Sequence, residues 1–183
     1  MHEVSLNRFI TDYVSGKSIT LTTYEDLRQY LGRLLVEEKG FPIQNISSKY
    51  LLSLDLGDVD YDIIVDYVVY LQDKPALLLG FCPGAVSTYV TQFVSLARIF
   101  PRGPVPFAVV TDTMDASLIR VQDKKELCRG INCIPTWNQL QSMYASCSDF
   151  NFSYKRLNME KRIAYAMFAL SGGCCSQECT TND

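Results

Sequence analysis

The sequence predicts an α/β fold with a mixed central sheet of four to five strands flanked by helices. Residues 59–69 alternate between two faces and residues 76–81 are apolar on both, so both segments are predicted strands. Turn residues at 72–75 join them into a hairpin. A helical pattern over 85–100 leads to a further apolar strand at 105–111. A hairpin, a crossover helix and another strand together give a mixed sheet with helices on both faces.

The N-terminal part of the chain is predicted to be helical. Apolar residues recur at helical spacing over 6–14, which predicts a short outer helix. Residues 22–25 match a capping box, and the helix that they open is expected to end at Gly40. We expect Arg28 to lie off its buried stripe. That stripe is made of four leucines: Leu27, Leu31, Leu34 and Leu35.

The remaining elements are predicted from shorter patterns. Residues 46–54 form a candidate first strand, and residues 117–121 are expected to form an edge strand. Residues 124–128 are expected to make one helical turn. Two further helices are predicted, the first opened by Pro135 and the second over 159–170. No repeat or linker divides the chain.

Composition sets broad limits on the function. A chain of 183 residues with a net charge of −3 is expected to form one domain without a global positive field that attracts nucleic acid. No apolar run approaches the roughly 18 residues that a membrane span needs. The first residues lack the pattern of a signal peptide, so we expect a cytoplasmic protein. The predicted domain covers residues 1–172.

The seven cysteines are odd in number and irregularly spaced, which argues against a disulfide framework and favours reduced thiols. Residues 173–183 are expected to form a disordered, cysteine-containing tail. Cys128 and Cys133, five positions apart, together with the tail cysteines allow an alternative, a zinc-binding or thiol regulator. The tail cysteines are Cys174, Cys175 and Cys179.

Three segments resemble a known family. They are TTYEDLRQYLGRLLVEEKGFP in the predicted helix, DYDIIV in the first hairpin strand and KPALLLGFCPG in the second. Over about residues 22–140 the chain resembles the N-terminal domain of type I restriction enzyme R subunits. The resemblance implies a restriction-endonuclease-like core of the PD-(D/E)xK nuclease fold.

The resemblance also implies where a catalytic site would lie. The family's chemistry needs an Asp on one strand, and an acidic residue and a Lys two apart on the next. The carboxylates hold Mg²⁺ and the Lys positions the attacking water. Asp62 matches the first position, and Gln92 falls near a glutamine common in the crossover helix. Gly80 and Cys82 stand at the acidic and lysine positions, and neither supplies the required group.

These departures predict a pseudo-nuclease. We expect the hairpin to place Asp62 opposite positions 80–83, with the Cys82 sulfur facing the first helix. The favoured function is a binding or assembly module without a cofactor, for a DNA or protein partner, and a homo-oligomer is one form that such an assembly could take. The enzyme alternative is a divergent Mg²⁺-dependent DNA endonuclease that uses Asp62 as a metal ligand with Glu37 or Glu38.

Overall fold

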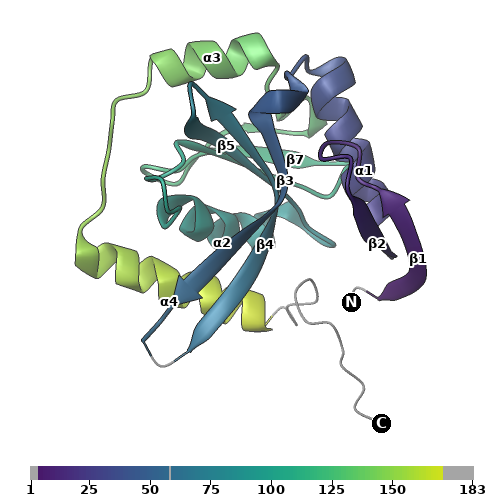
Figure 1. Cartoon of the computed structure of the whole chain (residues 1–183). Coiled ribbons are helices and arrows are strands. Elements are labelled where there is room, and N and C mark those ends of the chain that lie inside the picture. The colour runs from purple at the N-terminus through teal and green to yellow at the C-terminus, as the bar shows by residue number, and fades with distance from the viewer. Residues whose placement is uncertain (1–3, 58, 171–183) are drawn as a thin grey trace.

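A six-stranded mixed sheet forms the centre of the protein (Figure 1). The computed structural model describes residues 4–57 and 59–170. Neighbouring strands run antiparallel, except that β5 and β6 are parallel. The predicted α/β class is confirmed, but the sheet has six strands instead of four to five. In spatial order the strands are β3 (Ile46–Asp55), β4 (Asp60–Leu71), β5 (Lys74–Phe81), β6 (Phe107–Thr111), β7 (Ala116–Arg120) and β8 (Lys125–Arg129).

Strand β8 replaces the helical turn that was predicted at 124–128. Lys124 has a left-handed backbone, with a φ of 58°, and it reverses the chain directly before β8. The reversal lets β8 pair with β7. The backbone hydrogen bonds of this pairing stabilise the strand more than a single helical turn would be stabilised, because so short a helix is unstable by itself. Strand β7 is therefore an inner strand, and the prediction that it forms an edge is wrong.

The N-terminal helix predicted over 6–14 is also wrong, because this segment belongs to a two-stranded ribbon. Strands β1 (Ser5–Thr11) and β2 (Ser18–Thr22) pair antiparallel and form a separate sheet. The Asp12 carboxylate accepts hydrogen bonds from the Ser15 backbone N–H at 2.8 Å and the Ser15 hydroxyl at 2.6 Å. These bonds fix the turn, so side-chain capping of the reversal decides against the helix.

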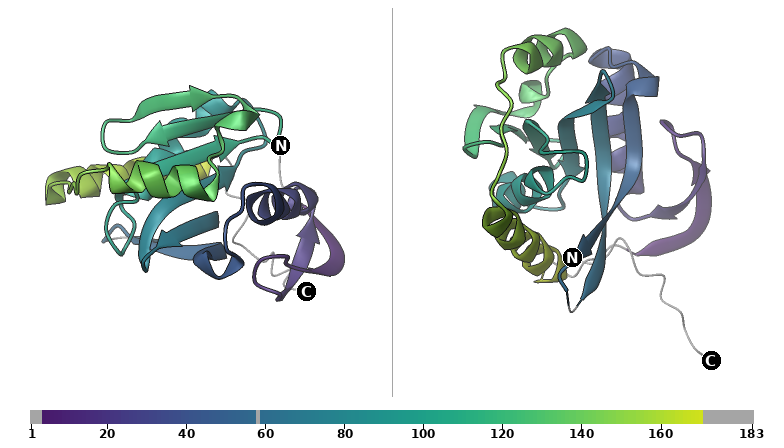
Figure 2. Two further views of the ribbon diagram at one scale, coloured as in Figure 1. Left: turned by 90° about the horizontal axis from the view of Figure 1, so that it is seen from above. Right: turned by 60° about the vertical axis from the view of Figure 1, so that its left-hand side comes forward.

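Helices cover both faces of the sheet (Figure 2). One face is covered by α1 and α3, the other by α2 and α4, and α1 continues into a π-helical segment. None of the helices in the described part of the chain is long and apolar enough to cross a membrane. The helices are α1 (Glu25–Arg33), α2 (Val86–Arg98), α3 (Trp137–Ala145) and α4 (Tyr154–Leu170), with the π-helical segment at Leu34–Glu38 and short 3-10 helices at Ile43–Asn45 and Ile131–Cys133.

The side chains of β4 change faces part-way along the strand. Val65 packs in the core cluster beneath α2, whereas Tyr67 packs in the cluster beneath α1. The prediction that alternate residues from Tyr61 to Val69 share one face is therefore wrong. The change occurs opposite Lys49 of β3, whose φ of 50° interrupts the regular strand geometry.

A buried ion pair joins α2 to α4. Arg98 Nη1 lies 2.6 Å from Glu160 Oε1, and these side chains are 6% and 1% exposed. Ser95 Oγ donates to the other Glu160 oxygen at 2.6 Å. Burial alone would raise the pKa of Glu160, but hydrogen bonds from Ser95, Arg98 and Arg156 hold this pKa below its usual value. Glu160 is therefore a fixed anion between the two helices.

The lowered pKa makes the stability of the protein depend on pH. Because the folded-state pKa lies below the usual 4.5, the contribution of Glu160 is complete above that pH and is lost as the pH falls through the folded value. We expect Glu160→Gln to lower the unfolding free energy at pH 7 by about 2–3 kcal/mol. Between pH 5 and pH 3 the variant should lose less stability than the wild type in urea titrations. The exposed Glu38→Gln is the control, and identical pH slopes for Glu160→Gln and wild type would contradict the assignment.

Candidate functional site

The register of the central hairpin places Asp66, not Asp62, beside Gly80. Tyr67 pairs with Leu79, and continuing this register by one residue brings Asp66 opposite Gly80. Strand β5 ends at Phe81, so the chain leaves the sheet before it reaches the level of Asp62. The expectation that Asp62 lies opposite positions 80–83 is therefore wrong.

Asp62 lies instead on the outer part of the β3–β4 hairpin. It pairs with Ser53 of β3, and its Oδ1 accepts a hydrogen bond from Ser53 Oγ at 2.6 Å in an exposed position. Glu37, one of its proposed partners, accepts a hydrogen bond from the Tyr13 hydroxyl at 3.0 Å at an exposed site. Nothing in these contacts supports the assignment of Asp62 as a metal ligand.

Both carboxylate oxygens of Asp66 have buried hydrogen-bond donors. Arg28 Nε lies 2.7 Å from Oδ1, and the Phe81 backbone N–H donates to Oδ2 at 2.7 Å. Burial raises the pKa of Asp66, while the charge of Arg28 and the Phe81 N–H oppose that rise. The residue thus ties α1 to the end of β5.

Glu25 lies on the same face of α1 and is fully buried. Its Oε2 is 2.7 Å from Lys49 Nζ and 3.9 Å from Arg28 Nη1, and Gln29 Nε2 donates to its Oε1 at 2.9 Å. The predicted capping box does not form, because the residue at the helix N-cap is Tyr24 and no side chain caps it. Glu25 turns inward instead, and an acidic residue of the first turn becomes part of the interior.

Helix α1 is rotated relative to the predicted stripe. Leu27, expected in the core, is 37% exposed, whereas Arg28, expected outside it, is 7% exposed. The close approach of the helix depends on Gly32, because a β-carbon there would lie 2.8 Å from the Tyr67 hydroxyl oxygen. That hydroxyl donates to the Arg28 carbonyl oxygen at 2.6 Å. The packing of Tyr67 against α1 therefore sets the face that carries the charged residues.

Asp12 extends these contacts to the N-terminal ribbon. Its Oδ1 accepts from Gln29 Nε2 at 2.8 Å, and its Oδ2 accepts from Ser48 Oγ at 2.6 Å. Burial would raise the pKa of Asp12, but hydrogen bonds from Gln29, Ser15 and Ser48 lower it below the usual value. We refer to the connected side chains as the buried polar network: Asp12, Glu25, Arg28, Gln29, Lys49 and Asp66.

Gly80 and Cys82 belong to the opposite face of the sheet. A β-carbon on Gly80 would overlap the ring of Phe93 in α2. Cys82 is fully buried in the core cluster beneath α2, and its thiol lies 3.4 Å from the Gly84 carbonyl oxygen, as a donor. The expectation that its sulfur faces the first helix is wrong. Burial raises the pKa of the Cys82 thiol to about 12, so this thiol stays neutral.

Comparison with known families identifies the chain. The family described as type I restriction enzyme R protein N terminus matches residues 23–135, more than half of the sequence. The chain belongs to this family. Searches of curated proteins and of solved structures give no match.

Asp66 stands beside Gly80, the residue that the resemblance places at the acidic position, but Asp66 points to α1 and a side chain at position 80 would point to α2. The catalytic assignment of position 80 stays a prediction. Gln92, which the resemblance singled out together with Asp62, is 4% exposed, and its Oε1 has no hydrogen-bond partner in the described part of the chain. Its functional role stays a prediction.

Two of the described cysteines differ from the reduced state expected for them, whereas Cys82 and Cys147 are free thiols. Cys128 and Cys133 form a disulfide, so the prediction of reduced thiols is wrong for this pair and neither is available to zinc. Within residues 4–57 and 59–170, no three side chains of His, Cys, Asp or Glu are placed to hold a metal ion. The predicted tail at 173–183 lies outside the described residues, so its part of the zinc alternative stays a prediction.

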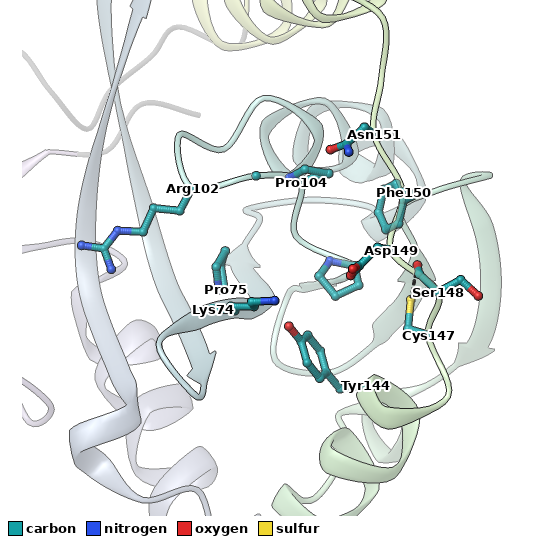
Figure 3. A pocket seen from close by; sticks show the side chains of 12 residues that line it. Lys74, Pro75, Arg102, Pro104, Tyr144, Cys147, Ser148, Asp149, Phe150 and Asn151 are labelled. Atoms are coloured by element: carbon teal, nitrogen blue, oxygen red, sulfur yellow. Dashed lines mark hydrogen bonds between the residues drawn. The ribbon is translucent and has the colours of Figure 1, made fainter.

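A separate pocket lies at the other end of β5 (Figure 3). It has a volume of about 310 Å³, and part of its wall comes from residues 144–151, outside the matched segment. The side chains of Lys74 and Tyr144 point toward one another, and Arg102 points away from both. No hydrogen bond or ion pair joins the Lys74 ammonium to another described residue. The Lys74 ammonium is therefore an accessible cation of this pocket, which lies at the end of β5 away from Asp66.

Sequence reasoning missed all six members of the buried polar network, including the residues that surround Asp66. Two signals point to some of them in retrospect. Asp66 is the single charge within the apolar run IIVDYVVYL, and a charge there needs a buried partner. Glu25 and Arg28 are three positions apart on a helix, a spacing that puts both on one face.

The contact at Gly80 makes a specific prediction about stability. We expect Gly80→Ala to lower the unfolding free energy by about 1–3 kcal/mol, because the added methyl group overpacks against Phe93. Gly84→Ala is the matched control, since a β-carbon there would lie 3.5 Å from Tyr89, an ordinary contact. Urea titration of both variants measures the difference. Equal stabilities of the two variants would show that Phe93 does not fill the space beside residue 80.

Proposed function

We propose that this family member is a binding or assembly module that has lost metal-dependent DNA cleavage. The observation that carries the proposal is the Phe93 ring, which fills the space that a side chain at position 80 would need. A carboxylate cannot be placed there without moving α2. In this proposal, both the residue at position 80 and the packing of Phe93 against it prevent a carboxylate from taking part in metal binding.

The remaining groups do not restore the chemistry. Hydrolysis of a phosphodiester by this fold needs oxygen ligands for Mg²⁺ and a cation beside the attacking water. Asp66 retains a carboxylate, but Arg28 and the Phe81 N–H engage its two oxygens. The neutral Cys82 thiol replaces the lysine and carries no charge that would stabilise the transition state. We infer that the module needs no metal cofactor.

A protein partner, including a second copy of the chain, is favoured over nucleic acid. The net charge of −3 repels phosphates, so DNA would require a local basic surface. Helix α4 carries the densest cluster of cations, but Arg156 is paired with Glu160 and Lys161 donates to the Asp55 carbonyl oxygen. The pocket with the accessible Lys74 suits a carboxylate of a protein partner.

The proposal predicts that the purified protein does not cleave plasmid or linear DNA in 10 mM Mg²⁺ or Mn²⁺. The physical reason is the missing second carboxylate and lysine. Agarose gels of supercoiled plasmid give the readout, and Asp62→Ala and Asp66→Asn serve as controls. Cleavage that persists in both variants indicates a contaminant. Cleavage that either substitution abolishes would overturn the proposal and favour the nuclease alternative.

Two binding measurements separate the partner classes. The fluorescence anisotropy of labelled duplex DNA should not change up to about 10 μM protein at 150 mM salt. The reason is that the net negative charge of the protein repels the DNA phosphates. Sedimentation velocity at about 10–200 μM tests for a second copy as the partner. Submicromolar DNA binding at that salt concentration would contradict the preference for a protein partner.

A further inference from the structure

We infer that the Arg28 guanidinium, with Lys49 as a second cation, is the built-in counter-ion of the carboxylates that would otherwise face a divalent metal ion. The inference rests on the proposed loss of metal-dependent cleavage and concerns what occupies the site in its place. Asp66 and Glu25 are the two buried carboxylates on the α1 face of the sheet, and Arg28 lies 2.7 Å from the first and 3.9 Å from the second. A side chain of the protein thus supplies the positive charge.

Asp66 cannot bind a divalent metal ion and the Arg28 guanidinium at the same time. Mg²⁺ binds carboxylate oxygens at about 2.0–2.1 Å and keeps a shell of further oxygen ligands. Arg28 Nε lies 2.7 Å from Asp66 Oδ1, and the Phe81 N–H lies 2.7 Å from Oδ2. A metal ion on either oxygen would meet the guanidinium or displace a backbone hydrogen bond. The site as built does not fit a divalent ion.

Arg28 is suited to a buried position. A guanidinium is weakly hydrated and remains charged at any pH that a folded protein meets. The Arg28 side chain is 9% exposed and lies over the Phe81 ring, 5.5 Å from its centroid. Tyr24 packs against the same ring at a centroid distance of 5.5 Å. The Phe81 ring thus packs against the cation beside Asp66, and Tyr24 packs against that ring.

Lys49, the second cation, has an energetically unfavourable backbone conformation. Its φ of 50° is in the left-handed region, which disfavours a residue with a β-carbon by about 1–2 kcal/mol. The residues on either side keep a regular register with β4, so Lys49 stands opposite Asp66. Its ammonium lies 2.7 Å from Glu25. The distorted backbone coincides with an ion pair to the second carboxylate.

The inference that Arg28 takes the place of a metal ion is tested by removing the Arg28 side chain and adding a metal ion. In Arg28→Ala, Asp66 and Glu25 lose a shared cation, and we expect 10 mM Mn²⁺ to raise the melting temperature by about 3–5 °C, as for a site with a Kd near 1 mM. Wild type should show no such shift. Adding Asp66→Asn to Arg28→Ala should abolish it.

Arg98→Ala is the matched control, because it removes the other buried arginine that pairs with a glutamate. It leaves a single carboxylate, Glu160, which still has Arg156 as a partner at 2.7 Å. Mn²⁺ should therefore leave its melting temperature unchanged. A shift equal to that of Arg28→Ala would overturn the inference, because the effect would then not be specific to the Asp66 site.

If Arg28→Ala does not fold in metal-free buffer, refolding from urea with and without Mn²⁺ decides the question. Folding only with Mn²⁺ supports the inference, and failure in both conditions contradicts it. Absence of a Mn²⁺ effect in a folded Arg28→Ala also contradicts it. These results are independent of the DNA cleavage assay on wild type, so failure of this inference and failure of the proposed function can be told apart.

Discussion

The ion pair between Arg28 and Asp66 joins the first helix to the central hairpin, and the surrounding structure depends on its being satisfied. A buried carboxylate without a partner costs several kcal/mol, so the fold has to deliver a cation to Asp66. That requirement sets which face of α1 is turned inward. It also explains why Leu27, an apolar residue, is left partly exposed.

The same constraint reaches beyond the two residues. Gln29 bridges Glu25 and Asp12, which connects the N-terminal ribbon to α1. Lys49 leaves regular strand geometry where β3 passes Asp66, and β4 changes faces at the same level. A buried polar network of this kind contributes little net stability compared with an apolar core, but loss of any one member is costly. We infer that it fixes the relative positions of α1, β3, β4 and the ribbon.

The fold class was predictable because long, strongly patterned segments determine it. The hairpin, the crossover helix α2 and the strand after it were expected from their apolar periodicity, and the structure confirms them. The ribbon at β1–β2 and the edge strand β8 were missed because their five to seven residues carry no reliable period. Their conformations depend on pairing partners and on left-handed turn residues such as Lys124, which a local pattern does not reveal.

The site was harder to predict than the fold. The resemblance and the expected pairing of the hairpin pointed to Asp62, and that pairing did not allow for the break at Lys49 or for the end of β5 at Phe81. The two aspartates are four residues apart, so both lie at even positions and periodicity alone cannot separate them. Burial and hydrogen bonding separate them at once, since Asp66 is 8% exposed and Asp62 lies at an exposed site.

A double-mutant cycle with Arg28→Met and Asp66→Asn tests most directly whether this ion pair is the constraint on which the structure depends. Urea unfolding at pH 7 gives the four free energies. We predict that each single substitution costs about 3–5 kcal/mol and that the coupling energy between them is at least about 2 kcal/mol. Additivity within about 0.5 kcal/mol would contradict the account, because it would mean that Arg28 and Asp66 do not depend on each other.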